Sequence, residues 1–176
     1  MSILKVSRLG HPVLRKPSEA VPKESITSPA MQAFLRDMVE TMREYDGVGL
    51  AAPQVHVGKQ IAVIEVHENP RYAKAPSVPL THLINPKIVA YSKEQIEDWE
   101  GCLSIDGLRG RVPRAAWVDV EALSEQGKPV KFRAEGFFAR VVQHECDHLA
   151  GKVYVDRMPN LSTLTFLQEF ARYWNE

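Results

Sequence analysis

Two histidines four residues apart stand in the segment QHECDH, residues 143–148. If this segment is helical, His144 and His148 lie one turn apart on the same face, and both imidazoles can reach one metal ion. Glu145 then lies about 100° further around the helix, which suits a carboxylate beside a metal-bound water better than a ligand. The pattern predicts a metal centre with a neighbouring general base.

Two core histidines, each satisfied by a hydrogen bond, would also fit this pattern. Apolar residues on nearly every side of residues 137–149 predict a buried helix, however, and a cation would compensate the polar groups that it carries. A catalytic site usually has three protein ligands. The third could come from downstream, from Asp156 or Glu169, as in zincin-type proteases. Cys102 in EGCLS is the stronger candidate, although most free cysteines simply pack in the core.

The composition is globular and has no charge bias. Hydrophobic residues make up 44% and charged residues 25% of 176 residues, which predicts one catalytic domain over residues 1–176. Basic and acidic residues number 22 each, so no net charge favours nucleic acid or an anionic membrane as a partner. No apolar run approaches the roughly 18 residues that a membrane helix needs. Two cysteines without an export signal favour reduced thiols in the cytosol.

The elements around the motif predict an α+β fold. A helix with a polar outer face is expected from residue 29 to about 45, with Ser28 as its N-cap. The extended segments are expected at Ile61–Val66, 80–91, Trp117–Leu123 and 130–134. A turn at 124–128 would make the last two a hairpin. The chain thus predicts antiparallel strands folded around one buried metal-binding helix, with an N-terminal surface helix and a short C-terminal helix over the tail, residues 161–174.

A third segment, GVGLAAPQ at residues 47–54, has two glycines but lacks the lysine of a phosphate loop, and its Gln54 could be a surface amide. GVGLAAPQ, EGCLS and QHECDH, in this order and at these separations, resemble the three signature motifs of peptide deformylases, the bacterial-type polypeptide deformylase family. The likeness also includes LGHPVLRKPSEAV, INP at 84–86 and GLRGRVPR at 107–114. Because it begins at about residue 3, no cleaved transit peptide is expected.

The resemblance implies a metal-dependent hydrolase that removes the formyl group from formyl-methionine of newly synthesised polypeptides and releases formate. It implies that Cys102, His144 and His148 bind one divalent ion, usually Fe(II) in this family, with zinc, nickel or cobalt as substitutes. Ligand types alone do not select the ion, because zinc outcompetes ferrous iron at such sites. The implied setting is the cytoplasm near the ribosome exit, with no direct contact to nucleic acid or membrane.

The resemblance also assigns roles within the site. Glu145 takes a proton from water and delivers it to the departing amine. The side-chain amide of Gln54 and the backbone N–H of Leu103 stabilise the oxyanion together with the metal. The substrate's main chain and its methionine side chain are expected to contact Val48, Gly49, Gly101, Phe137, Arg140 and Val141.

Two positions depart from the family pattern. Asp106 stands where many relatives carry proline, and the charged Arg140 stands where an apolar pocket residue is more usual. Asp147 faces away from the metal and is expected to pair with Arg114, while Cys146 is expected to pack in the core. The remaining histidines are interpreted as structural or surface residues: His11, His56, His67 and His82.

Two other classes of protein remain open. A zincin-type metallopeptidase would use the same helix but would not need Cys102 or Gln54. A non-catalytic metal-binding protein would keep the ligands but would have no use for Glu145 beside an open coordination position.

Overall fold

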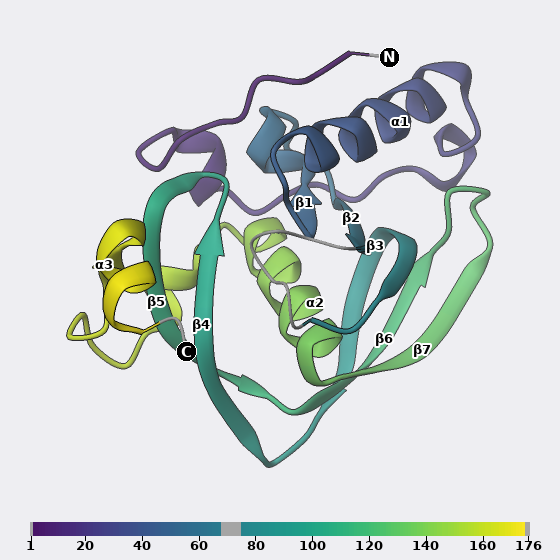
Figure 1. The fold of residues 1–176 in the computed structure, drawn as a ribbon. Coiled ribbons are helices and arrows are strands. Elements are labelled where there is room, and N and C mark those ends of the chain that lie inside the picture. Colours follow the sequence, from purple (N-terminus) through teal and green to yellow (C-terminus); the bar gives the residue numbers. More distant parts are fainter. Residues whose placement is uncertain (1, 68–74, 175–176) are drawn as a thin grey trace.

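The structure, a computed structural model, describes residues 2–67 and 75–174. Within these ranges the strands form two antiparallel sheets (Figure 1). The sheet of order β1-β2-β3-β6-β7 consists of β1 (Gly49–Ala51), β2 (Ile61–Val66), β3 (Val78–Tyr91), β6 (Trp117–Leu123) and β7 (Pro129–Glu135). The sheet of order β4-β5-β8 consists of β4 (Gln95–Cys102), β5 (Ile105–Ala115) and β8 (Thr165–Phe166). The helices are α1 (Pro29–Glu44), α2 (Gly136–Leu149) and α3 (Leu167–Tyr173), with short 3₁₀ helices at Pro12–Arg15, Lys23–Ser25, Ala52–Val55 and Tyr154–Arg157.

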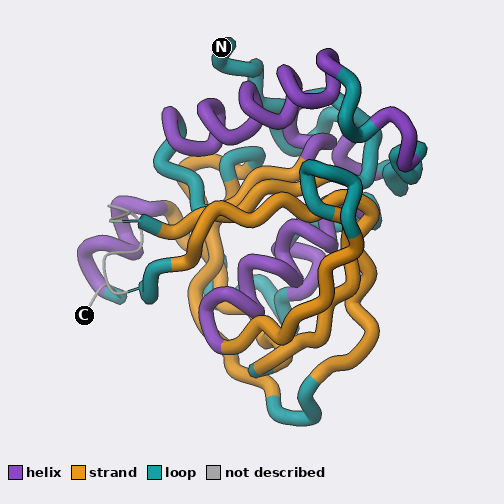
Figure 2. Tube along the Cα trace, turned by 90° about the vertical axis from the view of Figure 1, so that its right-hand side faces the viewer, coloured by secondary structure: helices purple, strands orange, loops and turns teal. Residues whose placement is uncertain are grey.

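Helix α2 occupies the middle of the fold, between the five-stranded sheet and the β4–β5 hairpin (Figures 1 and 2). Its apolar residues, among them Ala139, Val142 and Leu149, join the core cluster of the five-stranded sheet. The chain enters the helix from β7 through Gly136, whose φ of 55° lies in the left-handed region that glycine tolerates best. The predicted buried helix is therefore confirmed, and its polar motif lies inside the protein.

Helix α1 lies on the outside and covers β1 and β2 (Figure 1). The Ser28 side chain accepts a hydrogen bond from the backbone N–H of Met31 at 3.3 Å, as an N-cap does. The inner face of the helix belongs to a second core cluster through Leu35, Met38 and Met42. This confirms the predicted surface helix, and no helix in the described ranges is long and apolar enough to cross a bilayer.

The predicted strands are also confirmed, with β2 and β6 at the expected bounds and β3 and β7 within two residues of them. The C-terminal helix is shorter than the segment 161–174, because α3 covers only Leu167–Tyr173. It lies on the face of the β4–β5 hairpin that points away from α2 (Figure 1).

The long β4–β5 hairpin is the element that the sequence pattern did not predict. In β4, only Glu100 and Cys102 are buried, so the strand lacks the apolar alternation that marks a half-buried strand. Glycine and proline also interrupt β5, at Gly107, Gly110 and Pro113. Toward α2 the hairpin makes mainly polar contacts, and such contacts leave no period in the sequence. Its apolar residues, among them Ile105 and Val112, pack against Tyr154 in a separate small cluster.

Candidate metal centre

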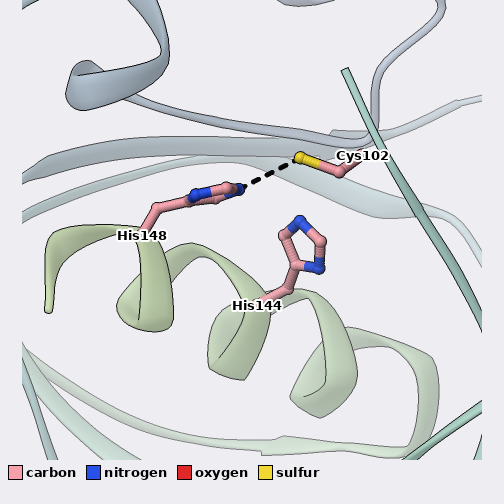
Figure 3. A group of neighbouring side chains, drawn as sticks. All are labelled: Cys102, His144 and His148. Atoms are coloured by element: carbon pink, nitrogen blue, oxygen red, sulfur yellow. Dashed lines mark hydrogen bonds between the residues drawn. The ribbon is translucent and has the colours of Figure 1, made fainter. Parts of the chain in front are cut away.

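Three potential metal ligands meet where the turn of the β4–β5 hairpin approaches α2. Cys102 is the last residue of β4, and His144 and His148 rise from successive turns of α2 (Figure 3). One ligand atom of each lies within 4.8 Å of those of the others, and the Cys102 Sγ is 3.3 Å from the His148 Nε2. Among the described residues this is the group of His, Cys, Asp and Glu side chains that could hold a metal ion; the downstream candidates Asp156 and Glu169 are not part of it.

A carboxylate behind His144 orients its ring. The His144 Nδ1 lies 2.9 Å from the Glu100 Oε2, which leaves Nε2 for a metal. Histidine ligands are commonly held by a carboxylate in this way, which sets the tautomer and makes the ligand more basic. Glu100 is itself bound by Arg114, whose Nε and Nη2 lie 2.9 and 3.0 Å from its two oxygens. Although Glu100 begins the EGCLS segment, nothing in its spacing indicated this contact.

The electrostatics of the group fit a bound cation. Burial by itself raises the pKa of the Cys102 thiol, but the His148 and His144 imidazoles outweigh it and hold that pKa well below its usual value. Burial likewise lowers the pKa of His144, yet contacts with Cys102 and Glu100 raise it well above the usual value. The site thus stabilises a thiolate next to positive charge. A divalent cation supplies that charge and accepts one thiolate and two imidazoles as ligands, so these residues fit a metal.

The Glu145 carboxylate lies beside this group and is 3% exposed. Burial raises its pKa to about 7, and its Oε2 has no hydrogen-bond partner among the described residues. Its position depends on Gly49, because a Cβ at residue 49 would lie 2.3 Å from the Glu145 Oε1. A carboxyl group whose pKa is near neutrality can both accept and release a proton during a reaction.

The side-chain amide of Gln54 also faces the group. Gln54 is 1% exposed, so its interpretation as a surface amide is wrong. Its Oε1 accepts the backbone N–H of Ala51 at 2.9 Å, which turns Nε2 toward the Cys102 Sγ at 3.4 Å and the Ser104 Oγ at 3.3 Å. A short 3₁₀ helix, Ala52–Val55, holds the residue in this place. The amide is therefore a fixed hydrogen-bond donor at the edge of the potential metal site.

A pocket of about 480 Å³, including its open mouth, lies in front of these groups. Its lining contains all six residues expected to contact substrate, Val48, Gly49, Gly101, Phe137, Arg140 and Val141. It also contains Gln54, Cys102, Leu103, His144 and Glu145. Gly47, Trp99 and Glu100 complete the wall and were not anticipated from the sequence. One cavity thus brings together two of the three candidate ligands, Cys102 and His144, with the buried carboxylate and the amide donor.

A buried ion network supports the site from behind. Arg114, expected to pair with Asp147, donates to its Oδ2 at 2.5 Å and also binds Glu100. Arg157 adds a contact of 2.6 Å to the other oxygen of Asp147. Burial by itself raises the pKa of Asp147, but the two arginines hold it below its usual value. The network therefore links both strands of the β4–β5 hairpin to α2.

Removal of Arg114 from this network should strongly destabilise the fold. Arg114→Met removes the cation that two buried carboxylates share and leaves Glu100 to Arg140 and Asp147 to Arg157, so the loss should lie toward the lower end of the about 3–5 kcal/mol typical of a broken buried pair. The free energy of unfolding in urea measures this effect. Arg111→Met on the same strand is the matched control, because Arg111 pairs with Glu97 while both are more than 40% exposed. That control should cost less than about 1 kcal/mol, and equal losses in the two variants would contradict the role of the buried network.

Asp106, Cys146 and the remaining histidines lie outside the pocket lining. Asp106 forms a pair with Arg8 at 3.3 Å in which both side chains are more than 60% exposed, so it lies on the outer rim of the hairpin. Cys146 packs against the main core cluster, as expected, and burial raises its pKa to about 12. The His11 Nδ1 accepts the backbone N–H of Val13. His11 also packs edge-on against His56, while His82 lies near Glu125 and His67 is exposed.

Comparison with known proteins agrees with this geometry. A family model described as polypeptide deformylase matches residues 3–163. Peptide deformylase 2 of Pseudomonas putida is 42% identical over 168 residues, which are 96% of this chain and 89% of that protein. A Met-Ala-Ser-bound class I type b peptide deformylase from Acinetobacter baumannii has a TM-score of 0.87 at 38% identity, over 89% of this chain and 99% of that chain. A peptide deformylase from Synechococcus elongatus in complex with actinonin has a TM-score of 0.80 at 39% identity, over 89% and 79% of the two chains. The chain therefore belongs to the polypeptide deformylase family.

Proposed function

We propose that this protein hydrolyses the N-terminal formyl group of formyl-methionyl polypeptides in the cytoplasm, with one divalent cation held by Cys102, His144 and His148. The observation that carries the proposal is the buried Glu145 carboxylate beside this ligand group, at the wall of a pocket with an apolar end. The Met-Ala-Ser peptide held by the Acinetobacter relative supports the substrate class, since it is what remains when formyl-Met-Ala-Ser loses its formyl group.

The cation and the protein divide the chemistry. When bound, a divalent cation acts as a Lewis acid that makes water a nucleophile near neutral pH. We propose Fe(II) as the natural ion, as the family resemblance implies. Zinc, nickel or cobalt could substitute for it, because one thiolate and two imidazoles accept all of these ions. The carboxylate of Glu100 keeps the His144 ring turned toward the site.

Glu145 would move the proton. Water attacks the formyl carbon and loses a proton to the Glu145 carboxylate. The same proton then passes to the amide nitrogen as the C–N bond breaks, so that formate and a free amine leave. The oxyanion that forms in between would accept hydrogen bonds from the Gln54 Nε2 and from the backbone N–H of Leu103. Buried donors fixed before the reaction are effective here, because they need no reorganisation.

The substrate main chain would pair with two strand edges. β1 and β4 each stand at the edge of their sheet, and Gly49 and Gly101 from these strands line the same pocket. An extended peptide between them would form backbone hydrogen bonds as an added strand, with Val48 beside it. The methionine side chain would enter the apolar end formed by Phe137, Val141 and the stem of Arg140.

An anaerobic assay of the ferrous-loaded protein tests this function. Formate release should occur from formyl-Met-Ala-Ser, while acetyl-Met-Ala-Ser and internal peptide bonds should remain intact. Cleavage of internal bonds would favour the zincin-type metallopeptidase. Full metal loading without formate release would favour a non-catalytic metal-binding protein.

Cys102→Ser tests the ligand set. A serine hydroxyl stays protonated at neutral pH and is a much poorer ligand than a thiolate, so metal content after gel filtration should fall well below one equivalent. Cys146→Ser is the matched control, because Cys146 packs in the core away from the ligand group. Equal metal content in the two variants would contradict the role of Cys102.

Gly49→Ala tests the placement of Glu145. The new Cβ would overlap the Glu145 carboxylate and push it out of position. Displacement of a catalytic group by about 1 Å can cost roughly 10²-fold in rate, so kcat should fall on that order while metal content stays unchanged. Gly58→Ala is the control, since a Cβ at residue 58 meets no atom within 4 Å. An unchanged kcat for Gly49→Ala would refute this dependence on glycine.

A further inference from the structure

Arg140 is a buried charged residue beside the apolar side chains of Phe137 and Val141 in the pocket wall. It lies on α2 and is 6% exposed. Its Nη1 contacts the Glu100 Oε1 at 2.9 Å and the Val112 carbonyl at 2.8 Å, and lies 3.4 Å from the Asp98 carbonyl. Its Nη2 donates to the Ile96 carbonyl at 2.6 Å. All these acceptors belong to the β4–β5 hairpin, so the planar guanidinium is held in one orientation.

A second hollow, of about 390 Å³ including its open mouth, lies next to the pocket in front of the metal ligands, which we call the methionine pocket. Ile96, Asp98 and Ala116 contribute to its wall. Arg140 and Phe137 line both this hollow and the methionine pocket, so their side chains form the partition between the two. The partners of the guanidinium lie on both sides, because Glu100 lines the methionine pocket whereas Ile96 and Asp98 line the second hollow.

We infer that Arg140 forms the floor of the methionine pocket and sets the length of the first side chain that the enzyme accepts. This inference rests on the proposed deformylase function. A side chain longer than methionine would have to displace the guanidinium, and the hairpin carbonyls would then lose a buried donor. Glu100 would keep its contacts with Arg114 and His144, so the metal-facing part of the site would stay in place.

Two unbranched substrates test the floor. Formyl-norleucyl-Ala-Ser has a first side chain of the same length as methionine. The second peptide differs only in that its unbranched first side chain is two methylene groups longer. In the parent protein, kcat/KM should favour the norleucyl peptide by roughly 10- to 200-fold, as pockets that discriminate by chain length do. Arg140→Ala opens the partition, so this ratio should fall at least about tenfold. Both peptides are measured on one preparation, so metal content and folded fraction cancel in the ratio.

A second substitution refills the opened space. In Arg140→Ala/Ala116→Leu a larger side chain occupies the second hollow, and the ratio should return toward that of the parent. If Arg140→Ala does not fold, Arg140→Gln provides the same test with a smaller shift, since its side chain is shorter but keeps an amide donor for a hairpin carbonyl.

The outcomes separate this inference from the function on which it rests. A ratio in Arg140→Ala within threefold of the parent, with deformylation still proceeding, would overturn the floor and leave the proposed function intact. Absence of formate release by the metal-loaded parent on the norleucyl peptide would overturn both. A reduced ratio in Arg140→Ala that Ala116→Leu reverses would establish the floor.

Discussion

Glu145→Gln is expected to lower kcat for formyl-Met-Ala-Ser by close to the upper end of the roughly 10²- to 10⁴-fold that general acid–base catalysis contributes. The amide keeps the shape of the side chain but cannot take a proton from water or deliver one to the amide nitrogen. Glu145 would serve both of these steps, which is why the loss should be large. Steady-state formate release at saturating peptide measures it, with metal content determined on the same sample.

The control for this variant is Glu135→Gln, because Glu135 is exposed and immediately precedes α2. It should keep the parent's kcat. Metal content should stay near one equivalent in Glu145→Gln, since the side chains of Cys102, His144 and His148 are unchanged. A folded, metal-loaded Glu145→Gln protein with undiminished kcat would eliminate Glu145 as the proton carrier.

Gln54→Ala is expected to lower kcat by roughly 10²- to 10³-fold, the usual loss when one oxyanion donor is removed. The Nε2 of Gln54 is held toward the site by the bond between its Oε1 and the Ala51 N–H, so the donor is in place before substrate arrives. The loss should lie mainly in kcat and not in KM, because the oxyanion exists only along the reaction path. Steady-state kinetics over a range of peptide concentrations separate the two constants.

Two further substitutions make this prediction specific. Gln54→Glu keeps the size and the acceptor for Ala51 but replaces the donor with an anion, so its kcat should fall at least as far. Gln60→Ala removes a half-buried amide that donates to the Ser18 carbonyl elsewhere in the fold, and should leave kcat unchanged. A loss below about threefold for Gln54→Ala would contradict the oxyanion role.

The sequence by itself determined the features that depend on neighbours along the chain. The helical period places His144 and His148 on one face, and the Ser28 cap and the apolar alternation of β6 are equally local. The burial of α2 also follows from local sequence, because its own residues are apolar on nearly every side of the helix. The three motifs in their order also indicated the family, which the family-model match confirms.

No local pattern in the sequence relates the distant groups that meet at the histidines: the resemblance implied Cys102 and Gln54 there, and the tertiary structure shows how they are brought together. Cys102 is 46 residues from His148, and Gln54 is 48 residues from Cys102, so no local period relates them. The β4–β5 hairpin that carries Cys102 is held to α2 by ion pairs and carbonyl contacts, with Glu100 shared between Arg114 and Arg140. Such polar contacts depend on packing in three dimensions and leave no hydrophobic pattern in the sequence. For the same reason, the charge of Arg140 became intelligible only when its acceptors on the hairpin were in view.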